Sequence, residues 1–180
     1  KILLITGGTG SFGYAVLNRF LNTNHFSEIR IFSRDEKKQD DMRKKFGSSK
    51  IKFYIGDVRD IQSLRDTITG DVVVNLAAVH RDDVRNKSEY QQTNVVGAEN
   101  IAIVCSEKGI NKVIFTSSVA VYGFAVPGAD ESGVINPFNE YGRTKFAAEE
   151  ILRSWQRGGK NSLIIVRPTV IFGEGNRGNV

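Results

Sequence analysis

The chain has 180 residues, 40% of them apolar and 25% charged, a composition typical of one soluble globular domain rather than a disordered segment. The formal net charge is +5, but acidic and basic residues alternate, as they do between residues 34 and 41. We therefore expect no nucleic-acid partner. A phosphate-bearing ligand is a more economical reason for the excess of basic residues.

The few cysteines and histidines limit which disulfides and metal sites the chain can form. The single cysteine, Cys105, cannot form a disulfide within the chain, which is typical of a reducing compartment and predicts a cytoplasmic protein. The two histidines, His25 and His80, lack partners at metal-ligand spacing, so we expect no metal site. No apolar run reaches the length of a membrane span, and we expect no membrane association. The chain begins at Lys1 rather than Met, so we expect a piece of a longer protein.

The expected elements alternate between strand and helix along the whole chain. Strands are expected at residues 2–5, 28–33, 50–55, 71–78, 112–118 and 162–167, and helices at 14–21, 35–46, 60–69, 88–108 and 140–157. Asp60 suits a helix N-cap and Gly109 a helix C′ position. Such alternation predicts an α/β fold, a doubly wound parallel sheet of the Rossmann type with strand order 3-2-1-4-5-6. Residues 1–180 would form one NAD(P)-binding domain.

A glycine-rich turn joins the first expected strand to the first helix. Its glycines are Gly7, Gly10 and Gly13, with Ser11 and Phe12 between the last two. Gly7 permits the tight turn, Gly10 lets the backbone approach a pyrophosphate, and Gly13 lets the helix pack closely. The helix N-terminus offers N–H groups and a partial positive charge to the phosphates. This context predicts dinucleotide binding.

Several polar and small segments follow other strands of the predicted sheet. Asp57 comes after the third strand, Ala77 and Ala78 after the fourth, and Ser118 after the fifth. The carboxyl ends of parallel strands share one edge, and ligands bind there at the switch point between strands one and four. We therefore expect these segments to meet the glycine turn in space.

The end of the second strand indicates which dinucleotide binds. An acidic residue there favours NAD, because it hydrogen-bonds the ribose 2′-hydroxyl. Here Ser33 stands at that position and Arg34 follows it, and a hydroxyl with a guanidinium suits a 2′-phosphate. We predict NADP(H), with NAD as the second choice. In the alternative interpretation Arg34 is a surface charge and Asp35 reaches the ribose.

The start of the last long helix carries a candidate catalytic pair. Tyr141 and Lys145 are four residues apart and so share one helix face. A free tyrosine has a pKa of about 10, and a nearby ammonium with the charge of the nicotinamide is expected to lower it. Lys145 can also bond the nicotinamide ribose, and Ser118 can hold the substrate oxygen against Tyr141.

Other segments add to these motifs. They are Gly56-Asp57-Val58, Asn75-Leu76-Ala77-Ala78, Thr93-Asn94, Thr116-Ser117-Ser118 and Arg167-Pro168 with Gly173. Together with the glycine turn and the tyrosine–lysine pair, the chain resembles the extended short-chain dehydrogenases/reductases. It is most similar to their nucleotide-sugar epimerase/dehydratase family.

The resemblance implies roles for individual residues. Asp57 and Val58 would bind the adenine, and Ser118, Tyr141 and Lys145 would be catalytic. Tyr141 and Lys145 would also contact the cofactor. The other implied cofactor contacts are Gly7, Gly10, Ser11, Phe12, Gly13, Leu76, Ala77, Ala78, Asn94, Thr116 and Pro168, with Asn94 also a structural or relay residue. Members usually continue into a smaller substrate domain, which is largely absent here, and commonly form homodimers through the helices expected over 94–108 and 141–155.

The resemblance also bears on the reaction. The 4,6-dehydratases of this family carry Asp-Glu directly after the strand-five Thr or Ser, whereas this chain has Val119 and Ala120, which transfer no proton. Residues 32–36 and 56–60 do resemble dehydratases of polysaccharide biosynthesis that invert a sugar centre. We favour a nucleotide-sugar epimerase acting at C4. The alternatives are an NADPH-dependent reductase of a 4-keto nucleotide sugar and a non-catalytic dinucleotide-binding regulatory module.

Overall fold

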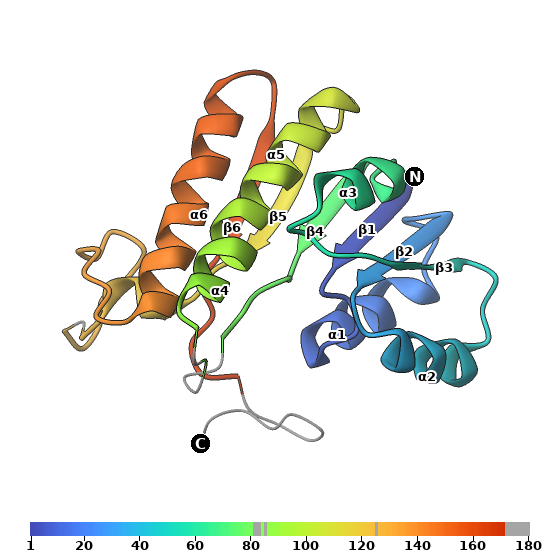
Figure 1. Ribbon diagram of the computed structural model, residues 1–180, viewed down its shortest axis with the longest axis horizontal. Helices are drawn as coiled ribbons and strands as arrows, with labels where there is room; N and C mark the ends of the chain where they lie inside the picture. Colours follow the sequence, from blue (N-terminus) through green and yellow to red (C-terminus); the bar gives the residue numbers. More distant parts are fainter. Residues whose placement is uncertain (81–83, 85, 125, 172–180) are drawn as a thin grey trace.

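The computed structural model of the chain describes residues 1–80, 84, 86–124 and 126–171 (Figure 1). Gly173, part of one motif above, lies outside the described residues. A six-stranded sheet has the order β3-β2-β1-β4-β5-β6, and every neighbouring pair is parallel. The predicted strand order and fold class are therefore confirmed.

The strands are short and their bounds are close to the predicted ranges. They are β1 (Ile2–Thr6), β2 (Glu28–Ser33), β3 (Ile51–Ile55), β4 (Val72–Asn75), β5 (Lys112–Thr116) and β6 (Ser162–Val166). The helices are α1 (Ser11–Leu21), α2 (Glu36–Phe46), α3 (Ile61–Thr67), α4 (Ser88–Tyr90), α5 (Gly97–Glu107) and α6 (Glu140–Arg157). A π-helical segment, η1 (Gln91–Val96), links α4 to α5, and a 3₁₀ turn, η2 (Val119–Tyr122), follows β5.

Two apolar cores lie on the two faces of the sheet. Buried side chains of α1 and α2, such as Leu17 and Met42, pack on β1, β2 and β3. Those of α3, α5 and α6, such as Leu64, Ile101 and Leu152, pack on the other face. Figure 1 shows α5 and α6 side by side over β5 and β6. Helices thus cover both faces, as a doubly wound sheet requires.

The predicted helix ends agree with the capping groups. Asp60 caps α3, because its carboxylate accepts a hydrogen bond from the Gln62 N–H at 2.9 Å. Gly109 follows α5 with φ +67°, the left-handed conformation that glycine adopts without steric cost. Helix α1 begins three residues earlier than predicted, at Ser11, with Gly10 as its N-cap.

Two further segments differ from the predicted elements near the carboxyl edge of the sheet. Strand β4 ends at Asn75, so residues 76–78, predicted as strand, leave the sheet. The helix expected over 88–108 contains the π-helical segment η1, a feature that often occurs at functional sites. The earlier end of β4 and the π-helical segment both change which side chains lie at the carboxyl edge of the sheet.

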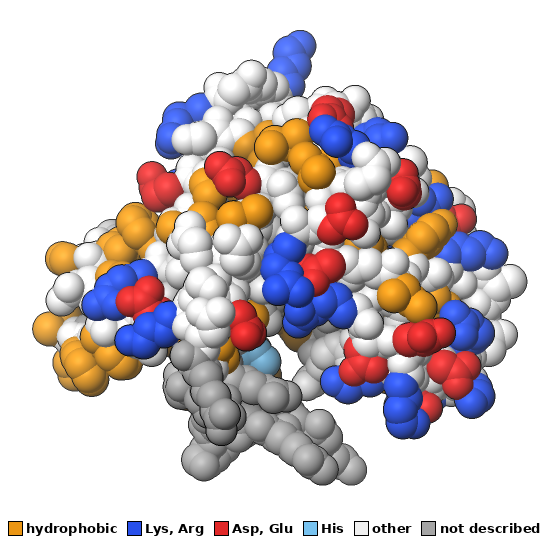
Figure 2. All heavy atoms as spheres, viewed as in Figure 1, with side chains coloured by type: hydrophobic (Ala, Val, Ile, Leu, Met, Phe, Trp, Pro, Cys, Tyr) orange, Lys and Arg blue, Asp and Glu red, His pale blue; other side chains and the backbone are white. Residues whose placement is uncertain are grey.

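Charged groups are dispersed on the molecular surface. On the face in Figure 2, basic and acidic side chains are interspersed, and α2 carries ion pairs such as Lys37–Asp41 and Lys44–Asp40. The five excess positive charges are therefore not gathered into one patch on that face. Within the described ranges, no helix has both the length and the apolar character needed to cross a bilayer.

Candidate dinucleotide and catalytic site

The glycine turn has the close contacts that its sequence predicts. Gly7 has φ +63°, and a Cβ there would lie 2.8 Å from the backbone nitrogen of Ala77. A Cβ at Gly13 would lie 2.1 Å from the carbonyl oxygen of Gly8. Gly7 and Gly13 are therefore required by the packing of the protein itself.

Gly10 differs from these two glycines. A Cβ there would meet only the Gly7 carbonyl oxygen, at 3.5 Å, an ordinary contact distance. Gly10 also lines a cleft above the strand ends. No side chain of the described residues caps α1, and its first turn holds no acidic residue. The helix N-terminus is therefore suited to an anion, and the glycine at position 10 suits a ligand approaching the backbone.

The cleft lies at the predicted switch point and has a volume of about 310 Å³. Of the predicted contacts, Gly7, Gly10, Ser33, Arg34, Asp57, Val58, Leu76, Ala77 and Ala78 line it. Thr9, Phe32, Asp35, Lys38, Gly56, His80 and Thr93 complete the lining. Ser11, Phe12, Gly13, Asn94, Thr116, Tyr141, Lys145 and Pro168 are not part of this wall. The glycine turn and the segments after β2, β3 and β4 thus converge in space.

Thr93 is a lining residue that the sequence reasoning missed. Its side chain is buried, with 6% of its surface exposed, and its hydroxyl finds no hydrogen-bond partner among the described residues. A buried hydroxyl without a partner is costly, so this group fits a polar ligand in the cleft. The signal in the sequence was its place directly before Asn94.

Asn94 has a structural position in the described part of the chain. Its amide nitrogen donates to the Val79 carbonyl at 3.1 Å and to the Thr144 hydroxyl at 3.0 Å. Its amide oxygen accepts from the Val79 N–H at 2.8 Å. Asn94 thus joins the segment after β4 to α6. Both donor hydrogens are used inside the protein, which agrees with the structural role expected for Asn94, and its contact with the cofactor stays a prediction.

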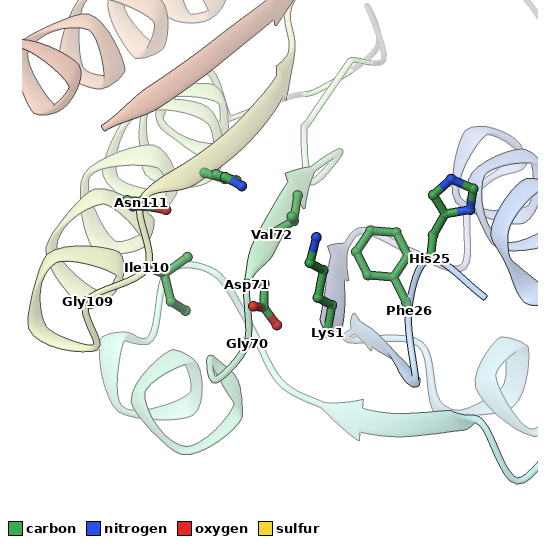
Figure 3. Close-up of a pocket in the computed structure, with 10 residues that line it drawn as sticks. Lys1, His25, Phe26, Gly70, Asp71, Val72, Gly109, Ile110 and Asn111 are labelled. Carbon is green, nitrogen blue, oxygen red and sulfur yellow. The ribbon is translucent and has the colours of Figure 1, made fainter. Parts of the chain in front are cut away.

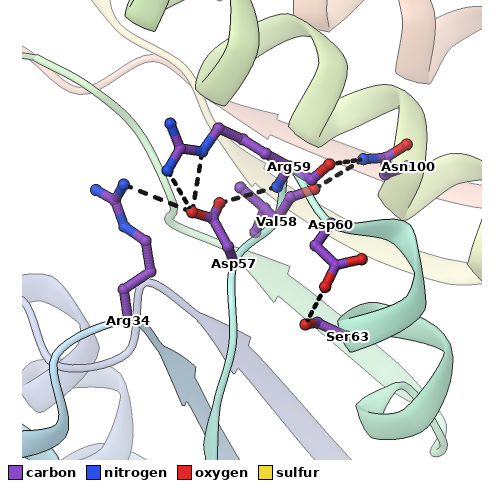
Figure 4. Close-up of polar contacts among 7 residues, drawn as sticks. All are labelled: Arg34, Asp57, Val58, Arg59, Asp60, Ser63 and Asn100. Carbon is purple, nitrogen blue, oxygen red and sulfur yellow. Dashed lines mark hydrogen bonds and ion pairs between the residues drawn. The ribbon is translucent and has the colours of Figure 1, made fainter.

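The expected adenine-binding residue, Asp57, lies between two arginines (Figure 4). Arg59 binds its carboxylate through Nε at 2.9 Å and Nη2 at 2.6 Å, and Arg34 approaches the same oxygen at 3.6 Å. Burial alone would raise the pKa of Asp57, but the hydrogen bonds and charges of these arginines outweigh it and lower the pKa. Asn100 donates to the Val58 and Arg59 carbonyls and so fixes the loop.

Cationic groups gather beside Ser33 at the end of β2. Arg34 and Lys38 both line the cleft there. Asp35 caps α2 by accepting from the Lys38 N–H at 2.9 Å, and the Lys38 ammonium lies 3.2 Å from the same carboxylate. Each cation thus has a carboxylate partner that also lines the cleft, Lys38 with Asp35 and Arg34 with Asp57.

The predicted catalytic residues Ser118 and Tyr141 are in contact. Ser118 is the N-cap of η2, and its side chain is hydrogen-bonded to the Tyr141 hydroxyl. Helix α6 reaches this point because Gly142 has no side chain: a Cβ there would lie 2.4 Å from the Ala120 carbonyl oxygen. Asn139 caps the helix by accepting from the Gly142 N–H at 2.8 Å.

The environment of Tyr141 in the protein alone affects the pKa of its hydroxyl. Burial raises its pKa, and the hydrogen bond from Ser118 only partly opposes this. The lowering predicted from a neighbouring ammonium is therefore not present in the protein alone. The reason is geometric, because the Lys145 ammonium lies over the ring of Phe115, 4.2 Å from its centroid.

Lys145 is 2% exposed. Desolvation lowers its pKa to about 7, and only the charge of Glu149 opposes this change. A lysine with such a pKa is poised to change charge near neutrality, a property common at functional sites. Val119 and Ala120 occupy η2 directly after Ser118. The acid pair typical of the dehydratases is thus replaced by apolar groups in the structure too.

A second cleft, of about 240 Å³, lies at the opposite, amino ends of the strands. Figure 3 shows Lys1, Phe26 and Asp71 around it, with Ile110 and Asn111 from the turn before β5. It has neither the glycine turn nor the tyrosine, so it offers no comparable chemistry. Within the described ranges, no group of three acidic, histidine or cysteine side chains could hold a metal ion.

Cys105 is buried, and burial raises the pKa of its thiol to about 12. It is thus an inert core residue, as predicted.

Comparison with known proteins identifies the family. The model of the NAD dependent epimerase/dehydratase family matches residues 3–180. The chain belongs to this family. Family membership agrees with the glycine turn, the strand order and the Ser118–Tyr141 contact. It confirms the resemblance inferred from the sequence motifs.

Individual relatives of the family are 4-epimerases by name. The chain is 52% identical over 129 residues to N-acetyl-alpha-D-glucosaminyl-diphospho-ditrans,octacis-undecaprenol 4-epimerase of Escherichia coli O157:H7, covering 70% of this chain and 39% of that protein. It is 48% identical over 139 residues to UDP-glucose 4-epimerase of Rickettsia prowazekii (strain Madrid E), covering 73% and 41%. The chain thus spans about two fifths of the length of these relatives.

A solved structure has the same fold. The UDP-Glc/GlcNAc 4-epimerase from Campylobacter jejuni superposes with a TM-score of 0.83 at 30% identity, covering 93% of this chain and 53% of that one. The matched region includes the sheet and its carboxyl edge, on which the candidate site lies.

Proposed function

We propose that this chain is the dinucleotide-binding part of a nucleotide-sugar 4-epimerase. The observation that carries the proposal is the Ser118–Tyr141 hydrogen bond at the edge that also holds the glycine turn. Val119 and Ala120 beside it favour epimerisation over water elimination, since neither can transfer a proton. The names of the relatives support the same reaction.

The protein's own groups supply positioning and proton transfer. Tyr141 takes the proton of the sugar 4-hydroxyl and later returns it, acting as base and then acid. Ser118 holds the same oxygen by a hydrogen bond. Lys145 supplies a positive charge on the same helix face as Tyr141 when it is protonated. The bound nicotinamide would accept a hydride from the sugar carbon and return it. The keto sugar would rotate between the two transfers, so that the hydride returns to its other face.

The lining residues fit a nicotinamide dinucleotide. Gly10 leaves room for a pyrophosphate at the α1 N-terminus, and the partnerless hydroxyl of Thr93 offers a polar contact. We propose NADP(H) as the preferred form. Ser33, Arg34 and Lys38 form a hydroxyl and two cations at the end of β2, which suit a 2′-phosphate. NAD, which the family's description names, is the alternative.

A substitution at Tyr141 tests the proposal. We expect Tyr141→Phe to abolish interconversion of UDP-glucose and UDP-galactose, or of the corresponding N-acetylhexosamines, and to leave dinucleotide affinity unchanged. Tyr54→Phe in β3 is the matched control and should keep full turnover. Chromatography of the products separates the outcomes. Net consumption of NADPH would indicate the reductase, and unchanged turnover in Tyr141→Phe would remove Tyr141 from the mechanism.

Assembly and location are further parts of the proposal. We propose a homodimer formed through α5 and α6, where Ile103 on α5 is 43% exposed, and a cytoplasmic location. Sedimentation analysis would test the first, and fractionation of cells would test the second.

A further inference from the structure

A buried carboxylate on α6 has no place in the proposed proton transfers. Glu149 is 0% exposed and lies four residues after Lys145 and eight after Tyr141. Residues at this spacing share one helix face. Buried carboxylates are rare unless a partner compensates their charge, so this one requires an explanation.

The compensating partner is Arg167, at the end of β6. Its Nε donates to one Glu149 oxygen at 2.9 Å and its Nη2 to the other at 2.5 Å. Its Nη1 also donates to the Tyr122 hydroxyl in η2 at 2.5 Å. The two hydrogen bonds form a bidentate pair that compensates the buried carboxylate, and the hydrogen bonds to Glu149 raise the pKa of Arg167.

The same arginine holds the segment that carries Ser118. The Ser117 N–H donates to the Val166 carbonyl at 2.7 Å, and the Val119 N–H donates to the Pro168 carbonyl at 3.2 Å. Residues 166–168 therefore flank Ser118 on both sides. Glu149, through Arg167, links the helix of Tyr141 and Lys145 to the segment of Ser118.

We propose that Glu149 is a positioning residue that favours the charged form of Lys145 and holds it and Ser118 in register with Tyr141. The proposal rests on the proposed function for the roles of those three residues. Removal of the Glu149 charge leaves Lys145 in an apolar site beside the Phe115 ring, facing the uncompensated charge of Arg167. Removal of Arg167 leaves the full charge of Glu149 to act on Lys145.

Other ionisable groups near Glu149 could also affect the titration of Lys145. Tyr141 and Arg153 lie on α6, and Arg167 follows β6. The elements packed against α6 also carry Tyr90 and the exposed Glu89 on α4, Cys105 and the exposed Glu99 and Glu107 on α5, and Tyr122 in η2. Arg153 is 40% exposed and lies 3.7 Å from the Glu149 carboxylate. The charge of Glu149 partly opposes the lowering of the Lys145 pKa that desolvation causes.

The experiment is an NMR titration of the lysine side-chain resonances in the isotopically labelled protein. The Lys145 signal is assigned by its loss in Lys145→Arg. We expect Glu149→Gln to lower the titration midpoint of Lys145, and Arg167→Gln to raise it, each by about one pH unit. Glu150→Gln is the matched control, because this neighbouring carboxylate is 51% exposed and pairs with Arg153.

The opposite signs separate the charge role from a purely structural one. Disturbed packing alone would move the midpoint in the same direction in both variants, and that result would overturn the proposal. So would midpoints equal to that of Glu150→Gln. If a single variant fails to fold, the double variant Glu149→Gln/Arg167→Gln removes both charges and should give a midpoint between the two expected ones. The titration needs no turnover, so it is independent of the Tyr141→Phe result.

Discussion

Alanine at Gly10 or Gly13 tests whether the glycine turn is shaped by the protein or by its ligand. At Gly13 the new Cβ would lie 2.1 Å from the Gly8 carbonyl oxygen, whereas ordinary contact begins at 3.4 Å. Overpacking against backbone costs about 3 kcal/mol, and the better helix propensity of alanine offsets about 1 kcal/mol. The net loss of about 2 kcal/mol corresponds to a decrease in Tm of about 4–8 °C for a chain of this size.

Alanine at Gly10 should behave in the opposite way. Its φ of −80° is allowed for any residue, and its Cβ meets no protein atom closer than 3.5 Å. The stability should change by less than about 1 kcal/mol. Dinucleotide affinity should fall at least tenfold, about 1.4 kcal/mol, because the methyl group occupies the space for the pyrophosphate. Thermal unfolding followed by circular dichroism and calorimetric titration with NADPH measure the two quantities.

The reasoning would be refuted by either of two results. If Gly10→Ala lowers Tm as much as Gly13→Ala does, then Gly10 is a packing residue and carries no information about a ligand. If Gly10→Ala binds NADPH as tightly as the unmodified protein, then the pyrophosphate does not lie against this turn.

Two other predictions concern charges at the site. Arg34→Ala should weaken binding of NADPH by at least about tenfold and binding of NADH much less. The control Lys37→Ala, which removes the partner of Asp41, should change the affinity for neither dinucleotide. Equal losses of NADPH and NADH affinity in Arg34→Ala would contradict the NADP preference. Lys145→Met should raise the free energy of unfolding at pH 7 relative to the unmodified protein. Because the folded-state pKa of Lys145 is about 7 and that of the unfolded chain about 10.4, the cost of burying this lysine is full below pH 7. This cost declines as the pH rises towards 10. The gain in stability of Lys145→Met, measured by urea unfolding, should therefore decline over the same pH range, and a gain that is independent of pH would contradict the lowered pKa of Lys145.

The fold could be predicted from the sequence because local and long-range signals agree in this chain. Runs such as 72–75 are apolar enough to be buried on both faces, and helical patterns separate them. Asp60 and Gly109 mark helix ends by side-chain chemistry and backbone freedom, which are local properties. The meeting of the glycine turn with Asp57 and Ala77 follows from the parallel strand order alone.

The parts that were missed depend on contacts between distant segments. The departure of residues 76–78 from the sheet follows from the packing of Gly7 against Ala77, which no local pattern reports. The π-helical segment places Thr93 at the cleft, although its composition resembles an ordinary helix. The pKa of Tyr141 in the protein without nicotinamide depends on its burial, because spacing along a helix gives the face of Lys145 but not the position of its ammonium.

Helix α6 presents its ionisable groups in order of increasing burial. Tyr141 is partly accessible and contacts Ser118, Lys145 lies deeper over Phe115, and Glu149 is enclosed with Arg167. An isolated ammonium at the depth of Lys145 would lose its proton near neutrality, because desolvation disfavours the charged form. A compensated carboxylate one turn further along opposes this loss without competing for the substrate's proton, since Arg167 already occupies both of its oxygens. The spacing of four and eight residues thus places the proposed proton-transfer group, a buried ammonium and its supporting carboxylate on one helix face.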